Sequence, residues 1–157
     1  MLQDVSYTLL QGNLEQEITN IAYHTGQTIP GSMFVCIEGV DQDGHIYAEE
    51  AIKKGAVVIL CSAPLSYEEP VTIVQVENCR RILAEISAVY YDHPAKKMKL
   101  IAVTGTKGKT TVAHMIRDVF LQEDVLCGLV GTVEVDTGKT LHPAQQTTPE
   151  SLDLHRL

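Results

Sequence analysis

The sequence predicts an α/β protein, in which a small N-terminal mixed α/β domain is followed by the beginning of a P-loop-type domain with a parallel sheet. Short strand-like runs alternate with helix-like runs, which is typical of α/β sheets whose strands are at least partly parallel. The apolar run 100–103 is followed by a glycine-containing loop and then by a segment with helical periodicity. This order of strand, loop and helix is what a phosphate-binding loop requires.

The first block, residues 1–94, reads as a self-contained domain. The expected strands are 18–22, 33–37, 56–61 and 71–76, the last three in one sheet. A helix is expected at 46–54, because its apolar residues share one face and Gly55 can end it. Asn78 can cap a second helix, whose apolar face reaches Tyr90.

A polar stretch, with the linker placed at 95–98, separates this block from residues 99–157. The second block is expected to contain strands at 100–103 and 125–130, a helix at 112–120, and an irregular or hairpin-like segment at 131–146 with a turn at Gly138. A last helix is expected to start with Thr148 as N-cap and Pro149 at the first helical position. Two parallel strands are too few for a nucleotide-binding sheet, so we expect a fragment of a longer protein.

The composition of the chain limits which partners and which cellular location we expect for the protein. The 157 residues are 45% hydrophobic and carry a net charge of −8, so we expect no nucleic-acid partner. We find no apolar run long enough for a membrane helix and no secretory signal. The four cysteines form no C-x-x-C pair, which favours small buried thiols in a reducing cytoplasm. The six histidines show no metal-ligand spacing.

The loop between the run 100–103 and the following helix carries the strongest chemical signal. Glycines let its backbone point N–H groups at phosphate oxygens, and the helix start adds a positive dipole end. Lys109 can reach the β and γ phosphates, and the Thr110 hydroxyl can join a Mg²⁺ shell. An ordinary glycine turn explains the glycines but not the Lys-Thr pair. The predicted nucleotide-binding residues are Gly105, Thr106, Lys107, Gly108, Lys109, Thr110 and Thr111.

The loop is compact, because the first glycine of the usual P-loop is replaced by Val103 and the glycine stands at 105. This form resembles the Mur ligases and their folylpolyglutamate synthetase relatives. The resemblance extends to the Pro-Gly element at 30–39, the Asp-Gly-His at 43–45, and the Thr-Thr-Pro-Glu-Ser-Leu-Asp at 147–153. It spans about 18–157, and the last motif is similar to that of the members that add the third amino acid of the peptidoglycan stem.

The resemblance implies an ATP-dependent carbon–nitrogen ligase with a catalytic Lys109. In this family the substrate carboxylate is phosphorylated by ATP, and an amino group then attacks the acyl phosphate. The N-terminal domain would hold the uridine diphosphate end of a UDP-N-acetylmuramoyl peptide, and the central domain would bind ATP and Mg²⁺, the metal through Thr110. The family's substrate residues correspond here to Thr25, Thr147 and Thr148.

Two departures from the family pattern leave alternatives open. Where the family has Asp-Ser-Arg, this chain has His24-Thr25-Gly26, and a glycine offers no guanidinium donors. Lys107 stands where the family commonly has Asn. The alternatives are a Mur-like ligase acting on a non-peptidoglycan carboxylate and a nucleotide-binding module without catalysis. We expect the 157-residue chain alone to be inactive, and we expect it to dimerise or to hold a loosely ordered second block.

Overall fold

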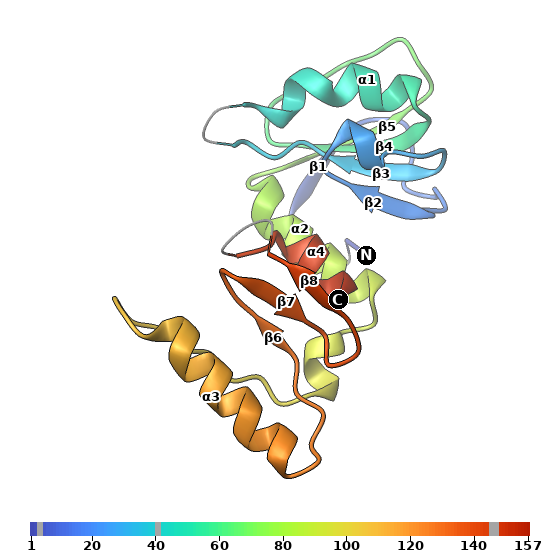
Figure 1. Cartoon of the computed structure of the whole chain (residues 1–157). Coiled ribbons are helices and arrows are strands. Elements are labelled where there is room, and N and C mark those ends of the chain that lie inside the picture. The colour runs from blue at the N-terminus through green and yellow to red at the C-terminus, as the bar shows by residue number, and fades with distance from the viewer. Residues whose placement is uncertain (3–4, 40–41, 145–147) are drawn as a thin grey trace. The chain divides into compact units, whose positions relative to one another are not determined.

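The computed structural model describes residues 1–2, 5–39, 42–144 and 148–157 (Figure 1). The chain divides into two compact units, Met1–Asp92 and His93–Leu157, which are described separately. Asp92 and His93, at the boundary, both have positive φ, at 57° and 48°. Three of the four residues predicted as the linker, 95–97, lie in a short 3-10 helix, Pro94–Lys97, and Met98 follows it as the C-cap.

Unit 1 is built on a five-stranded sheet with the order β1-β5-β4-β3-β2. Four strands are parallel neighbours, and the fifth pairs with β5 in the antiparallel direction. The bounds are β1 Tyr7–Gln11, β2 Asn20–Ala22, β3 Ser32–Val35, β4 Ala56–Cys61 and β5 Thr72–Val76. The prediction that three of these strands share one sheet is confirmed, whereas β1 was not predicted.

Two helices cover opposite faces of this sheet (Figure 1). Helix α1, Ala48–Lys53, is preceded by a 3-10 turn at Gly44–Tyr47, so the predicted helix at 46–54 begins two residues later than expected. Helix α2, Cys79–Tyr90, begins after Asn78, whose side chain accepts a hydrogen bond from the Arg81 N–H at 2.9 Å. The predicted cap is therefore confirmed.

The core of unit 1 lies between α1 and the sheet. Alternate residues of the parallel strands point to this face, because side chains alternate along a strand. Phe34, Ile59 and Ile73 are completely buried there, and Ala48 and Ala51 of α1 pack against them. Because alanine side chains are small, the helix can approach the sheet closely. This close packing holds the ends of the parallel strands in fixed positions.

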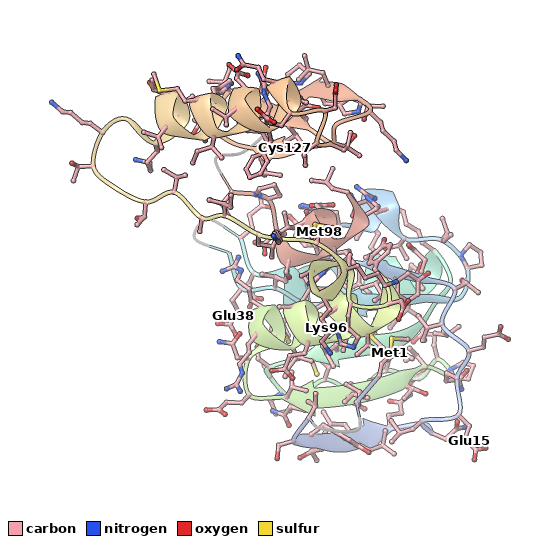
Figure 2. All side chains as sticks on the ribbon, turned by 90° about the horizontal axis from the view of Figure 1, so that it is seen from below. Met1, Glu15, Glu38, Lys96, Met98 and Cys127 are labelled. Atoms are coloured by element: carbon pink, nitrogen blue, oxygen red, sulfur yellow. The ribbon has the colours of Figure 1, made fainter. Side chains whose placement is uncertain are left out.

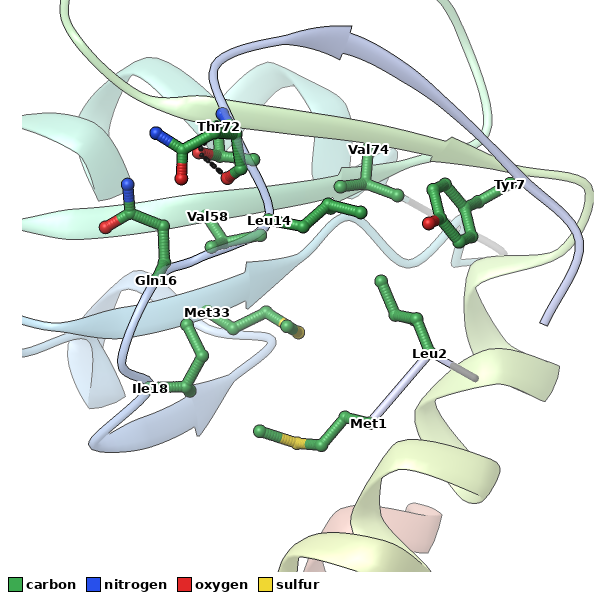
Figure 3. A pocket seen from close by; sticks show the side chains of 11 residues that line it. Met1, Leu2, Tyr7, Leu14, Gln16, Ile18, Met33, Val58, Thr72 and Val74 are labelled. Carbon is green, nitrogen blue, oxygen red and sulfur yellow. Dashed lines mark hydrogen bonds between the residues drawn. The ribbon is translucent and has the colours of Figure 1, made fainter. Parts of the chain in front are cut away.

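The other face of the sheet carries a hollow of about 280 Å³, shown in Figure 3. Met33, Val58 and Val74 form its floor from the sheet, and the N-terminal segment covers it. The hydroxyl of Thr72 is already bonded, since it donates to the carbonyl oxygen of Asn13 at 2.8 Å. The hollow is mainly apolar, and we assign it no chemistry.

Unit 2 consists of helices and a small antiparallel sheet. Its elements are α3 Lys109–Gln122, β6 Leu129–Val130, β7 Glu134–Asp136, β8 Leu141–Pro143 and α4 Ser151–Arg156. The three strands run in the order β6-β7-β8. The predicted helix at 112–120 is confirmed within α3, and Gly138 lies in the β7–β8 turn with φ of 77°. Positive φ is a conformation that glycine adopts without strain.

Three predictions for unit 2 were wrong in their bounds or type. Residues 100–103 form no strand, and only 129–130 of the predicted strand 125–130 is paired. A strand needs backbone partners on a neighbouring strand. Among the described residues, 100–103 have no such partner strand. Leu100 is accordingly 70% exposed. Helix α4 starts at Ser151 with Glu150 as N-cap, because the Leu154 N–H bonds to the Glu150 carbonyl and not to an earlier one.

The cysteines of the two units should differ in reactivity. Burial raises the pKa of Cys36 strongly, that of Cys61 to about 11 and that of Cys79 to about 12. Cys127 was expected inside a strand, but it lies outside β6 and is only partly buried (Figure 2). We therefore predict that a thiol reagent at about pH 8 modifies Cys127 first in the native chain. Peptide mapping would check this, and equal labelling of Cys36 would contradict it.

Candidate nucleotide-binding site

The candidate site is the loop that leads into α3. Gly105 and Gly108 adopt φ of 150° and 78°, which favour glycine because other residues are strained there. Gly108 is the N-cap of α3 and supplies no capping side chain. The first N–H groups of a helix have no acceptor within the helix, so those of Lys109, Thr110 and Thr111 are available to an anion.

The loop is open on all sides within its unit. Every residue from Thr104 to Thr111 is exposed, and a β-carbon built on Gly108 would meet no atom within 4 Å. The Lys109 ammonium donates a hydrogen bond to the Gly105 carbonyl oxygen at 2.7 Å. Lys109 thus already lies over the loop. Its ammonium could replace this hydrogen bond to a backbone oxygen by one to a phosphate oxygen. The seven predicted nucleotide-binding residues are brought together on this one loop and helix start.

Charged side chains join α3 to strand β7. Arg117 donates hydrogen bonds to Glu134 at 2.9 Å and to Asp136 at 3.3 Å, and the bond to Glu134 is the main cause that raises the pKa of Arg117. His114 lies 3.1 Å from Glu134, and its other ring nitrogen lies 2.8 Å from the Thr110 carbonyl oxygen. All of α3 is described, and none of its side chains is buried, so these charged contacts, here called the charged seam, are a main connection between α3 and β7.

The sequence analysis missed this seam. It gave His114 no role, whereas the structure connects His114 to the backbone of the predicted metal residue Thr110. His114 and Arg117 are three residues apart, so they lie on the same face of the helix. Glu134 and Asp136 are two residues apart, so they lie on the same face of the strand. These two periodicities could have suggested a charged contact, but they could not say which strand faced which helix.

We predict that loss of Arg117 loosens α3 without changing the loop sequence. In Arg117→Met the carboxylates of Glu134 and Asp136 lose the guanidinium that both contact, so their mutual repulsion is no longer offset, although Glu134 keeps His114 and Asp136 keeps the Gly138 N–H. Hydrogen exchange of the α3 amides should become several-fold faster, because opening of the helix from β7 becomes easier. Arg156→Met, in the exposed pair with Asp153, is the matched control. Unchanged α3 exchange in Arg117→Met would contradict the role given to the seam.

The predicted substrate residues lie in different parts of the chain. Thr25 starts a 3-10 helix, Thr25–Gln27, in unit 1, and its carbonyl oxygen accepts a hydrogen bond from Lys54 at 3.0 Å. The pKa of Glu50 is lowered by hydrogen bonds from Lys54 and from Thr25. Thr148, in unit 2, is exposed and lies three residues before Ser151, the first residue of α4. Thr147 lies outside the residues that the structure describes.

Comparison with known families decides the affiliation of the chain. The family model described as the Mur ligase middle domain matches residues 103–157, which include the loop and α3. The model described as the Mur ligase family, catalytic domain, matches residues 17–91 in unit 1. The chain belongs to the Mur ligase family. The family resemblance inferred from the loop and the Pro-Gly element is confirmed.

Curated relatives support the same Mur ligase affiliation. The chain is 37% identical over 157 residues to a UDP-N-acetylmuramoyl-L-alanyl-D-glutamate–2,6-diaminopimelate ligase of Alkaliphilus metalliredigens, covering 100% of this chain and 32% of the relative. It is 40% identical over 157 residues to the ligase of the same name from Oceanobacillus iheyensis, covering 99% of this chain and 32% of the relative. The chain thus spans about a third of the length of these relatives.

Solved structures support the α/β fold of this Mur ligase chain. A MurF structure from Acinetobacter baumannii matches with a TM-score of 0.56 and 21% identity, covering 91% of this chain and 28% of that one. MurF ligase from Thermotoga maritima in complex with ADP matches with a TM-score of 0.51 and 23% identity, covering 66% and 23%. Within the described part of this chain, none of the helices has the length and apolar character that crossing a bilayer would demand.

Proposed function

We propose that this chain is part of an ATP-dependent carbon–nitrogen ligase of peptidoglycan precursor synthesis. The enzyme would add an amino acid to a UDP-N-acetylmuramoyl peptide through an acyl phosphate. The observation that carries the proposal is the open glycine loop at the start of α3, in a chain of the Mur ligase family. The names of the relatives, which are diaminopimelate ligases acting on such a peptide, support the substrate class.

The loop fits a nucleotide triphosphate by its chemistry. Positive φ at Gly105 and Gly108 turns the backbone, and the space beside Gly108 admits an anion next to the first N–H groups of α3. Lys109 would bind the β and γ phosphates, and Thr110 would offer its exposed hydroxyl to Mg²⁺. When bound, ATP supplies the phosphoryl group that activates a carboxylate. The residues of this chain would orient that group and offset its charge.

Assignment of Mg²⁺ to Thr110 rests on the loop alone. Among the residues that the structure describes, no group of three or more His, Cys, Asp or Glu side chains is arranged to hold a metal ion. A hydroxyl, phosphate oxygens and water make a complete shell for Mg²⁺, so one protein ligand is compatible with the proposal.

Unit 1 would hold the uridine diphosphate end of the substrate, with Thr25 as one contact. Thr148, together with Thr147, would contact the muramoyl-diphosphate part. A second function is favoured by Gly26, where the family pattern has Arg: a Mur-like ligase that acts on another carboxylate. The two candidates differ in the affinity of this chain for uridine nucleotides.

Calorimetric titration with a UDP-N-acetylmuramoyl dipeptide separates the two functions. The peptidoglycan function predicts saturable binding by the unmodified chain. A β-carbon on Gly26 would meet no atom within 4 Å, so Gly26→Arg can be accommodated and should raise the affinity about tenfold by restoring charged donors. Gln122→Arg, at the exposed end of α3 in unit 2, is the control for an added guanidinium charge. Absence of binding in both the unmodified chain and Gly26→Arg would favour the second function.

Self-association and a cytoplasmic location stay predictions. Val112, Met115 and Val119 form an apolar stripe on α3 and are 44%, 61% and 61% exposed. Such a stripe favours association when it has no cover. Light scattering of the chain in solution tests the prediction, and a strictly monomeric species with a well-protected α3 would contradict it.

A further inference from the structure

A buried histidine joins three segments at one edge of the unit 1 sheet. His45 lies in the 3-10 turn before α1 and is 9% exposed. Its Nδ1 lies 2.5 Å from Oδ1 of Asp43, which also accepts the backbone N–H of His45 at 3.0 Å. These contacts lower the pKa of Asp43, the backbone hydrogen bond being the main cause. The carboxylate therefore fixes the orientation of the ring.

The second ring nitrogen of His45 accepts hydrogen bonds from the end of strand β4. The backbone N–H of Ser62 lies 2.9 Å from Nε2, and that of Ala63 lies 3.3 Å from it. Both groups are donors, so Nε2 must carry a lone pair, and the proton must be on Nδ1, facing Asp43. Protonation of Nε2 would keep the contact with Asp43 and lose both amide bonds.

Asp43, His45 and Ser62 resemble a nucleophilic triad, but the hydrogen bonds exclude that role. The Ser62 hydroxyl lies 3.2 Å from Nε2, yet it donates its proton to Glu38 at 2.6 Å. The lone pair of Nε2 is already directed at two amides, so it cannot take the serine proton. The cluster instead connects three backbone segments, and we call it the His45 tie. Glu38 follows β3, His45 precedes α1, and Ser62 follows β4.

The tie lies where open α/β sheets bind ligands. Parallel strands present their carboxyl ends at one edge, and ligands of such sheets lie outside that edge. Ser62 directly follows the carboxyl end of β4, and Glu38 stands three residues after the last residue of β3. A hollow of about 460 Å³ opens beside Ser62, lined by Gln75 and Glu77 at the end of β5. The Gln75 side chain donates to the Ser62 carbonyl oxygen at 3.0 Å, which continues the tie to a third strand.

We propose that His45 is a positioning residue that holds the backbone at Asp43 and the end of β4, together with the side chain of Glu38, in place for the uridine diphosphate end of the substrate. The proposal rests on the proposed function, which assigns that end of the substrate to unit 1. His45 itself is buried and would touch no ligand; it acts through the backbone of Ser62 and Ala63 and through Asp43. Its neutral form is the one that positions these segments.

Charged and titratable groups lie around the contacts of His45. Asp43 belongs to the same segment as His45, and Glu38, which accepts the Ser62 hydroxyl, follows β3. Cys79 interacts electrostatically with both carboxylates, and Cys36 interacts with Asp43. Neither thiol is charged near neutral pH, because burial raises its pKa. Variants of His45 therefore isolate the contribution of its ring.

Two substitutions at His45 distinguish the effect of its hydrogen-bond acceptor from the effect of its ring shape. His45→Gln keeps an acceptor oxygen that does not titrate, whereas His45→Phe keeps a ring without an acceptor. His142→Phe, on the exposed strand β8 of unit 2, is the control. Amide hydrogen exchange by NMR measures the protection of Ser62 and Ala63 in the full chain, and calorimetry with uridine diphosphate measures affinity.

We expect about tenfold lower amide protection and about tenfold weaker uridine diphosphate binding in His45→Phe, with His45→Gln within about threefold of the unmodified chain. If the amides respond as expected while affinity is unchanged, the tie exists but does not position the ligand, and the proposal is wrong. If the unmodified chain does not bind uridine diphosphate, the proposed function of unit 1 is wrong. The amide protection of Ser62 and Ala63 is measured without ligand, so it still shows whether His45 connects the segments.

Discussion

Replacement of Phe34 by alanine is expected to lower the free energy of unfolding of unit 1 by about 3–5 kcal/mol. Phe34 is completely buried at the centre of the face between α1 and the sheet, against Ile59 and Ala51. Truncation removes the buried ring and leaves a cavity that the parallel strands cannot close, because β3 is hydrogen-bonded on both sides. Since proteins of this size are stable by only about 5–15 kcal/mol, much of the stability of the domain would be lost.

Urea unfolding followed by far-ultraviolet circular dichroism measures this change. Ile46→Ala is the matched control, because Ile46 is also an aliphatic residue of unit 1 but is 68% exposed, and its effect should stay within about 0.5 kcal/mol. Similar losses in the two variants would mean that the face beneath α1 is not the core of the unit.

The second large effect is expected at the loop. Lys109→Ala should weaken ATP binding by about tenfold or more, because a charged hydrogen bond to phosphate contributes about 1.5–3 kcal/mol. In the structure the Lys109 ammonium already reaches across the loop to the Gly105 carbonyl, so it can meet a phosphate there without rearrangement of the helix. Lys109 is exposed and α3 has no buried side chain, so the fold of the unit should survive the change.

Lys107→Ala serves as the control for the loss of one positive charge in the same loop. Lys107 precedes the helix start and should affect affinity by about threefold or less, since it contributes only a screened charge near the ligand. Calorimetry with ATP and Mg²⁺ on both variants decides between the lysines. Equal losses, or a larger loss for Lys107→Ala, would show that the assignment of the phosphate lysine is wrong.

The parallel strands of unit 1 could be predicted because their sequences carry a side-chain signal. Residues 56–61 are continuously apolar, as a strand covered on both faces requires. Strand β1 has no such signal, because it is an edge strand whose residues Tyr7 to Leu10 are all exposed and whose place is set by backbone pairing with β5. Such pairing depends on a partner more than 60 positions away, which local patterns do not contain.

The errors in unit 2 have the same origin. The run 100–103 has the composition of a buried strand, but composition alone cannot provide the neighbouring strand that its N–H and C=O groups need. The loop itself was predictable because its chemistry is local, with glycines and Lys109 within five residues. The contact of Glu134 with His114 and Arg117 joins segments 20 and 17 residues apart, so it required the structure.

The central claim is that this Mur ligase chain binds ATP at the loop before α3, and backbone NMR during titration with ATP and Mg²⁺ tests it most directly. The account predicts that the largest shift changes fall on the amides of residues 105–111, whose N–H groups have no helical acceptor, and that they disappear in Lys109→Ala. Saturable binding of ATP with unchanged amides at 105–111, or no binding at millimolar ATP, would contradict it.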